Sequence, residues 1–419
     1  MDSKLKAKTP WLWVPTLYFA EGIPYFIVNV ISVTMFKRLG MSNGDLAMYT
    51  SLLYLPWVVK PLWSPFVDII RTKRWWILAM QLAVTAGFAA LALSVSPDVF
   101  GWSLVIFYIV AFASATHDIA ADGFYMIALD QKQQSVFVGI RSTFYRIASV
   151  FGQGIIVVLA GILETRLGDI PKAWSTTLLA SSVLFALITL WHFRFLPKAE
   201  GAPAPDKTAA DLFREFGRSW ATFFKKPGVW LAIVFMLLYR LPEAFSVKML
   251  TPFLLDPADA GGLGLTTAQS GLVYGTVGVI ALTIGGILGG LFAAKYGLKR
   301  SMWPMSMALA LPCAVYLFMA AVQPASLWVV YACVALDQFG YGFGFTAYLL
   351  YMMQFSEGEF KTSHYAICTA FMALSMMVPG LFAGWLQERV GYVGFFIIVM
   401  ICCLATISVT FFARRRCSS

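Results

Sequence analysis

Charged side chains recur inside long apolar stretches of this sequence, where a charge is costly unless it faces water or a partner. One group is Thr116-His117-Asp118-Ile119-Ala120-Ala121-Asp122-Gly123. Asp118 and Asp122 are four residues apart, a spacing that puts both carboxylates on one face of a helix. Two carboxylates this close hold a shared proton more readily than one alone. The pattern favours a group that takes up and releases a proton.

Two arginines, Arg141 and Arg146, lie on the next apolar stretch, which must run back in the opposite direction. Their depths match those of Asp122 and Asp118 to within about one helical turn. We therefore expect a cluster of two acids and two bases, which is either a proton switch or a purely structural clamp. His117 points to another part of the helix surface.

A second charged group lies in the later half of the chain, within Tyr239-Arg240-Leu241-Pro242-Glu243. Arg240 and Glu243 are three residues apart and share a helix face. The pair could bind a zwitterion, or an acidic group with its counter-proton, or it could simply neutralise itself. Further along, Asp337 has Gln338 and Tyr341 beside it, and no base in the next apolar stretch obviously neutralises it.

Two further charges, Glu21 and Lys60, lie at a similar depth in the first and second apolar stretches. Glu21 is roughly 15 Å deep at 1.5 Å per residue, so the two could pair and hold the helices together. Lys60 lies among Pro56, Pro61 and Pro65, each of which removes a backbone donor, and broken helices of this kind line transporter cavities.

We divide these residues into two sets of candidates by the chemistry that their side chains allow. The proton-coupling candidates are Glu21, Asp118, Asp122, Glu243 and Asp337. The candidates for the substrate's anionic groups or sugar rings are Tyr18, Tyr25, Lys60, Arg141, Arg146, Tyr239, Arg240, Gln338 and Tyr341.

The elements that must position these residues are membrane spans. Of 419 residues, 59% are apolar and 12% are charged, against about 25% charged in soluble domains. The mean hydropathy is +0.75, and a membrane helix needs about 20 mostly apolar residues. The sequence predicts an all-α membrane protein of two six-helix bundles, with spans near 11–36, 43–69, 75–96, 101–127, 134–163, 173–196, 228–255, 266–294, 301–322, 325–353, 362–387 and 391–413.

The long polar stretch in the middle divides the chain into residues 1–197, a linker at 198–227, and residues 228–419. In the linker, Asp211-Leu-Phe-Arg-Glu-Phe-Gly-Arg-Ser-Trp220 could form an amphipathic helix on the membrane surface. Most of the 31 Lys and Arg fall in the tails and the even-numbered loops. This asymmetry predicts that both termini are cytoplasmic, and it accounts for the net charge of +10 without nucleic acid.

Weak similarity between the two halves indicates parallel repeats. Leu39-Gly-Met-Ser42 and Leu263-Gly-Leu-Thr266 open equivalent spans, with Ser42 and Thr266 as expected N-caps. The loops after these two spans resemble the signature loop of the major facilitator superfamily. They either latch one access state or merely anchor the topology. The residues expected in this gating role are Asp68, Arg71, Arg74, Lys295, Lys299 and Arg300.

Three segments resemble the AmpG-type muropeptide permeases and the related acetyl-coenzyme A transporters. They are Leu53–Asp68, Thr116–Gly123 and Leu238–Ala244, although Glu21, His117, Arg240 and Glu243 depart from the family's usual residues. The resemblance implies a bacterial inner-membrane permease that imports peptidoglycan fragments with protons. The positions carried over from the family are Lys60, Asp118, Asp122, Arg240 and Glu243.

Sequence motifs for catalysis are missing, because there is no nucleophile elbow and no phosphate-binding loop. The six cysteines do not have the spacing of a zinc site. We therefore expect that the protein is not an enzyme and binds no cofactor or metal. The energy for transport would come from an ion gradient or from the substrate gradient. The expected partners are a small-molecule substrate, protons and the lipid bilayer, with a monomeric chain. The alternatives are an exporter or exchanger of acyl-CoA or siderophore-like compounds, and a non-transporting membrane sensor or scaffold.

Overall fold

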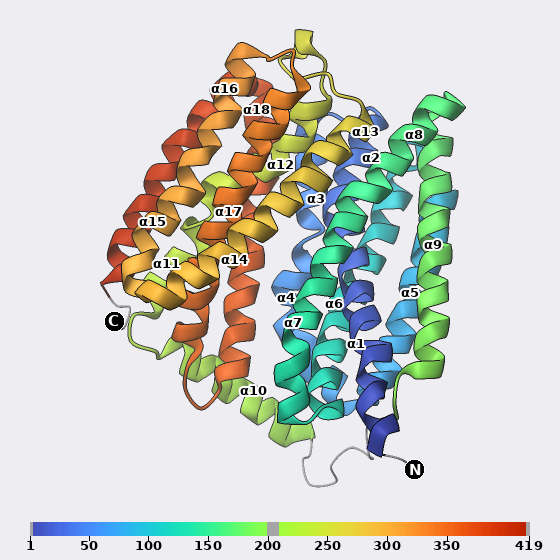
Figure 1. Cartoon of the computed structure of the whole chain (residues 1–419), viewed down its shortest axis with the longest axis vertical. Coiled ribbons are helices and arrows are strands. Elements are labelled where there is room, and N and C mark those ends of the chain that lie inside the picture. Colours follow the sequence, from blue (N-terminus) through green and yellow to red (C-terminus); the bar gives the residue numbers. More distant parts are fainter. Residues whose placement is uncertain (1–2, 199–208, 416–419) are drawn as a thin grey trace. The chain divides into compact units, whose positions relative to one another are not determined.

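The computed structural model describes residues 3–198 and 209–415, and the regular structure in these residues is helical (Figure 1). Nine helical segments among them are long and apolar enough to cross a membrane. The last of these, Lys361–Arg414, contains two of the predicted spans. The helix pair from Asn43 to Ile69 and the helix Leu327–Ser356 account for the other two predicted spans.

The chain forms two compact units, and the first comprises Met1–Ser32 and Leu62–Arg214. Its spans are helical and are joined by short connections. The helices are α1 (Ser3–Phe26), η1 (Ile27–Ile31), the later part of α4 (Leu55–Ile69), α5 (Lys73–Leu93), η2 (Pro97–Val99), α6 (Phe100–Ala128), α7 (Gln131–Val150), η3 (Phe151–Ile156), α8 (Val157–Leu167) and α9 (Ile170–Phe195).

The second unit comprises Val33–Pro61 and Glu215–Ser419. It therefore includes the second predicted span up to Pro61, a division that differs from the predicted boundaries at 197 and 228. Its helices are α2 (Ser32–Arg38), α3 (Asn43–Leu52), the start of α4, most of α10 (Ala209–Phe224), α11 (Val229–Leu238), α12 (Leu241–Leu255), η4 (Ala258–Ala260), α13 (Thr267–Ser270), η5 (Gly271–Gly278), α14 (Val279–Tyr296), α15 (Leu298–Ala310), η6 (Leu311–Cys313), α16 (Ala314–Val322), α17 (Leu327–Ser356) and α18 (Lys361–Arg414).

Two of the spans are interrupted close to the charged residues. The second span breaks at Leu53 and Tyr54 between α3 and α4, and the seventh breaks at Tyr239 and Arg240 between α11 and α12. In the seventh span the break is explained by Pro242, which lies in the first turn of α12 where its missing N–H costs nothing. A break leaves backbone groups without helical partners, so side chains must satisfy them.

Local sequence signals set the ends of several helices. The Ser42 side chain accepts a hydrogen bond from the backbone N–H of Asp45, and Thr266 forms a capping box with Gln269. Both predicted N-caps are thus confirmed. Gly391 has a φ of 68° inside α18, and this left-handed residue separates the two spans that the helix contains.

Helices α14 and α17 approach each other closely through glycines. A Cβ atom on Gly285 would lie 2.1 Å from the carbonyl oxygen of Phe339, and one on Gly342 would lie 2.0 Å from that of Leu282. Without hydrocarbon burial to drive association inside a bilayer, such close backbone packing is a main source of helix–helix attraction.

The predicted amphipathic linker helix corresponds to α10. Phe223 and Ser219 are buried, whereas Arg214 and Arg218 are exposed. Lys226, just after this helix, donates hydrogen bonds to the carbonyl oxygens of Phe355 and Glu357 at the end of α17. The helix is thereby attached to the second unit, and residues 199–208 of the linker lie outside the described residues.

Candidate functional site

In the first unit, helices α1, α6 and α7 bring an arginine onto an aspartate. Arg141 Nη2 lies 2.7 Å from Asp122 Oδ1, and their side chains are 34% and 40% exposed. The hydroxyl of Tyr18 donates to the same carboxylate oxygen over 3.3 Å. The Arg141 guanidinium lies 4.5 Å from the centre of the Tyr18 ring and 5.7 Å from that of Tyr125. These two charges are therefore paired, yet reachable by a solute.

The other expected members of this cluster are partly covered. Asp118 is half-buried and lies one helical turn from Asp122. Arg146 is also half-buried and lies somewhat more than one turn from Arg141. Glu21 is 8% exposed on α1, one turn beyond Tyr18, and Tyr25 is half-buried. Lys60 is half-buried on α4 and belongs to the second unit. Its pairing with Glu21 stays a prediction.

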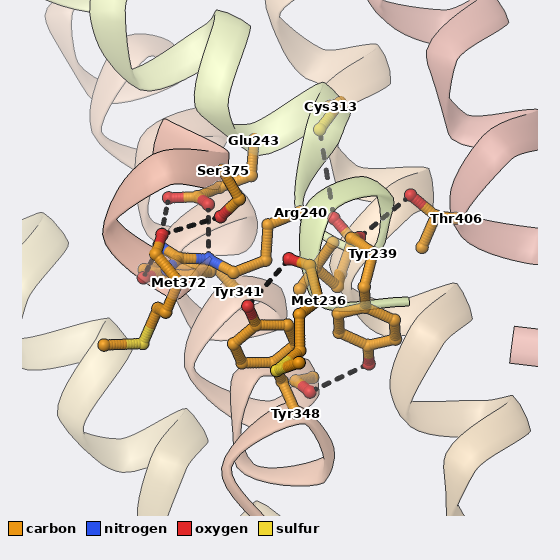
Figure 2. A network of polar contacts seen from close by, with 12 residues as sticks. Met236, Tyr239, Arg240, Glu243, Cys313, Tyr341, Tyr348, Met372, Ser375 and Thr406 are labelled. Atoms are coloured by element: carbon orange, nitrogen blue, oxygen red, sulfur yellow. Dashed lines mark hydrogen bonds and ion pairs between the residues drawn. The ribbon is translucent and has the colours of Figure 1, made fainter. Parts of the chain in front are cut away.

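In the second unit, the break between α11 and α12 carries the other predicted charge pair, shown in Figure 2. Arg240 Nε donates to Glu243 Oε2 over 3.0 Å, and Arg240 Nη2 donates to the Tyr341 hydroxyl over 2.7 Å. Both charged residues are 5% exposed. The guanidinium also lies 4.6 Å from the centre of the Phe345 ring, a distance typical of a cation–π contact. The pair is held rigidly and away from solvent.

Side chains of α17 and α18 satisfy the backbone that this break leaves open. Tyr348 donates to the carbonyl oxygen of Met236 over 2.7 Å, and Thr406 donates to that of Tyr239 over 3.0 Å. Tyr239 is fully buried and donates its hydroxyl to the carbonyl oxygen of Gly344. Its position indicates a role in fixing the break, because its hydroxyl is already engaged by the backbone.

Asp337 lies buried on α17 with neutral partners. Its Oδ2 accepts hydrogen bonds from the Tyr316 hydroxyl over 2.6 Å and from Gln338 Nε2 over 3.1 Å. Among residues 3–198 and 209–415, no base forms an ion pair with it. The structure thus leaves Asp337 as an acid stabilised by two neutral donors, which is compatible with its expected role in proton binding.

The predicted gating residues have several different surroundings. Arg74 donates from Nε to the carbonyl oxygen of Leu196 and from Nη2 to that of Phe193, so it caps the end of α9. Arg71 lies 6.0 Å from the Trp75 ring centre. Lys295 lies over Tyr296, and the Lys299 carbonyl oxygen accepts from Arg414. Arg300 is exposed, whereas the side chain of Asp68 lies outside what the structure describes.

A polar cluster that sequence reasoning missed joins the end of α2 and the start of α3 to the residue after α12 and to the middle of α18, near Gly391. Lys37 Nζ lies 2.5 Å from Asp256 Oδ1, and Tyr392 donates to Asp256 Oδ2 over 2.6 Å. Asn43 donates to Asp256 over 3.0 Å and to Gln387 over 2.8 Å. The partners of Asn43 lie 213 and 344 residues away along the chain, so no local pattern could have revealed them.

A second missed group is a buried chain of neutral side chains across α1, α5, α6 and α9. Gln81 Nε2 lies 3.0 Å from His117 Nε2 and 2.8 Å from His192 Nδ1. His192 Nε2 lies 2.9 Å from the Thr16 hydroxyl. Gln81 and both histidines are almost completely buried. Histidines near apolar stretches were the available signal, although only the fold shows that one glutamine joins them.

Comparison with known proteins places this geometry in context. The sequence profile described as Major Facilitator Superfamily matches residues 16–356 and 236–418. The anhydromuropeptide permease of Escherichia coli K12 is 24% identical over 391 residues, covering 91% of this chain and 75% of that protein. The putative transporter AmpG 4 of Rickettsia felis is 23% identical, covering 96% and 95%.

Solved structures show the same fold at low sequence identity. A bacterial homologue of the human lysosomal transporter Spinster has a TM-score of 0.74 at 14% identity, covering 99% of this chain and 98% of that one. The D-xylose–proton symporter has a TM-score of 0.72 at 12% identity, covering 95% and 97%. The predicted all-α membrane fold is confirmed.

Proposed function

The chain belongs to the major facilitator superfamily, and on that premise we propose that it couples protons to the uptake of a sugar-containing organic anion, with peptidoglycan fragments as the first candidates. It is a multi-pass membrane transporter and not an enzyme. Support for muropeptides comes from the distant similarity to the anhydromuropeptide permease and from the resemblance of three segments to that family.

The observation that carries the coupling proposal is the ion pair of Arg141 and Asp122. In this conformation Arg141 and Asp122 compensate each other's charge. An anionic solute that binds Arg141 would take over the positive charge. We propose that Asp122, no longer paired with Arg141, then takes the coupled proton, so that the solute anion and the proton occupy the site together.

Two aromatic rings, both buried in this conformation, lie beside this pair and would contact a sugar ring of a solute that reaches Arg141. Tyr18 and Tyr125 pack edge to face with ring centres 5.9 Å apart, and both lie near the Arg141 guanidinium. An apolar ring face next to a polar group is a common setting for a small-molecule site. The partly exposed pair in the first unit is therefore our primary candidate, with Asp118 and Arg146 as supporting charges.

The second unit supplies the further proton and substrate candidates. Arg240 and Glu243 form a buried pair that the half-buried Tyr341 contacts, whereas Asp337 is a buried acid with neutral partners. We propose that Asp337 is a second protonation site and that Arg240 and Glu243 keep the broken span in a defined shape. Such broken spans support substrate sites in transporters that work by alternating access.

Topology and organisation complete the proposal. We place the protein in a bacterial inner membrane, as the resemblance to the muropeptide permeases implies, and we expect a monomer. The distribution of Lys and Arg predicts that both termini are cytoplasmic. The functional domains are residues 1–197 and 228–419, joined by the linker. A reporter enzyme that is active only in the cytoplasm should be active when it is fused after Lys198 and when it is fused to the C-terminus. A reporter that is active only outside the cytoplasm should be inactive at both places.

Transport in proteoliposomes tests the function. Wild-type protein should accumulate labelled GlcNAc-anhydroMurNAc-peptide when a pH gradient, acid outside, is imposed. Asp122→Asn should retain exchange of labelled for unlabelled solute but lose accumulation driven by the gradient. Lys132→Gln, an exposed change on the same helix as Arg141, is the control. Normal gradient-driven accumulation by Asp122→Asn would rule out this coupling, and absence of wild-type transport would rule out this substrate.

A further inference from the structure

A lysine in α12 is buried among neutral side chains. Lys248 is 6% exposed, and its Nζ donates to the Thr50 hydroxyl over 3.0 Å. The ammonium also lies 5.6 Å from the centre of the Tyr54 ring. No carboxylate in the described parts of the chain forms an ion pair with it.

This arrangement differs from that of other cations within the helices. Arg141 is paired with Asp122, Arg240 with Glu243, and Lys37 with Asp256. A positive charge taken out of water costs several kcal/mol unless a partner compensates it. A buried lysine that contacts a hydroxyl and an aromatic ring therefore points to an anionic partner from outside the chain.

The ammonium and one neighbouring hydroxyl can both donate to a further acceptor. Thr50 already donates its proton to the carbonyl oxygen of Leu46, so its oxygen can only accept from Lys248. The neighbouring Ser51 hydroxyl is buried and has no hydrogen-bond partner in the described structure. A hydroxyl and an ammonium are thus both available to one acceptor.

A glycine of α18 keeps the two donors together. A Cβ atom on Gly380 would lie 2.3 Å from Ser51 Oγ and 3.2 Å from Lys248 Cε. Any side chain at position 380 would therefore fill the place that the hydroxyl and the lysine share. The break between α3 and α4 also begins at Leu53, two residues after Ser51.

We propose that Lys248 and Ser51, beside Gly380, form a subsite for a carboxylate group of the transported solute. The inference rests on the proposed function and adds a second contact for the solute's negative charge. Because Lys248 is covered by α3, the carboxylate reaches it when α3 separates from α12, and it then replaces Thr50 as the partner of the ammonium. A carboxylate can accept from both the ammonium and the serine hydroxyl.

Matched acid and amide ligands test the subsite. The probes are N-acetylmuramic acid and its carboxamide, with affinities measured by calorimetry on purified protein. Wild-type protein should bind the acid roughly tenfold more tightly, a difference of about 1.4 kcal/mol, because only the carboxylate accepts a charge-assisted hydrogen bond. Lys248→Met should bind acid and amide equally, and Ser51→Ala should lose part of the preference. Lys132→Met, an exposed change in α7, should keep it.

Smaller probes separate the subsite from the identity of the solute. Acetate should raise the melting temperature of wild-type protein more than acetamide or chloride does, and this difference should vanish in Lys248→Met. If the sugar acid does not bind but the acetate effect holds, the muropeptide proposal fails and the carboxylate subsite stands. Equal effects of acetate, acetamide and chloride on wild-type protein, or an unchanged acid preference in Lys248→Met, would overturn the subsite.

Discussion

Lys37 and Asp256 form an ion pair of 2.5 Å that connects the end of α2 with the residue following α12. Their side chains are only 14% and 13% exposed. The second carboxylate oxygen of Asp256 accepts from Asn43 and from Tyr392. Three side chains, from α2, α3 and α18, therefore converge on one carboxylate.

Removing one charge of this pair should destabilise the protein. In Lys37→Met the Asp256 carboxylate would remain largely covered with neutral donors alone, a loss of about 3 kcal/mol. Thermal unfolding in detergent measures the effect. The double variant Lys37→Met/Asp256→Asn should recover part of the loss because no unpaired charge remains.

An exposed ion pair provides the control for this experiment. Lys361 and Glu357 lie 3.8 Å apart with side chains 63% and 69% exposed, so Lys361→Met should cost less than about 1 kcal/mol. If Lys37→Met unfolds at the same temperature as Lys361→Met, the buried pair contributes nothing to stability.

A substitution at Gly384 tests how closely α3 and α18 must approach. A Cβ atom there would lie 1.8 Å from the carbonyl oxygen of Asn43, and backbone cannot move aside as a side chain can. Gly384→Ala should force α3 away from α18 and cost about 1–3 kcal/mol. Gly290→Ala is the matched control, because nothing lies within 4 Å of its added Cβ. Equal melting temperatures of the two variants would contradict this close packing.

Regular patterns in the sequence were sufficient to predict the membrane spans and part of the candidate site. Apolar length located the membrane helices, and the N-caps Ser42 and Thr266 follow from residue type alone. The partnership of Arg141 and Asp122 could be expected because adjacent antiparallel helices at matched depth must bring such residues close. Each of these inferences uses only local geometry and chain direction.

Contacts between distant segments could not be predicted in the same way. Asn43 bonds to Gln387 across 344 residues, and nothing near either residue specifies the other. The surroundings of Lys248 could not be predicted from the sequence either. That its partners are neutral is known only once the fold places α3 and α18 around it. One glycine in the left-handed conformation, Gly391, was enough to end one span and begin the next without a loop.

The buried Arg240–Glu243 pair should be sensitive to the shape of the cation as well as its charge. Arg240→Lys keeps the charge but replaces the planar guanidinium with an ammonium. The ammonium cannot reproduce the bonds that the guanidinium makes to both Glu243 and Tyr341. We expect it to reduce solute exchange about tenfold or more, whereas Tyr341→Phe, which removes one bond, should have a smaller effect. Exchange rates in proteoliposomes at equal protein content give the comparison, and equal rates for Arg240→Lys and wild type would contradict it.

The hydrogen-bonded side chains Thr16, His192, Gln81 and His117 should stabilise the first unit without affecting proton coupling. Gln81→Leu removes the amide that joins His117 to His192, leaving two buried ring nitrogens without this partner. The expected loss is about 1–3 kcal/mol per unsatisfied group, measured by thermal unfolding. The pH gradient needed for half-maximal accumulation should stay unchanged, because Asp122 and Arg141 keep their own contacts. A shifted gradient requirement with normal stability would instead make these side chains part of the proton path.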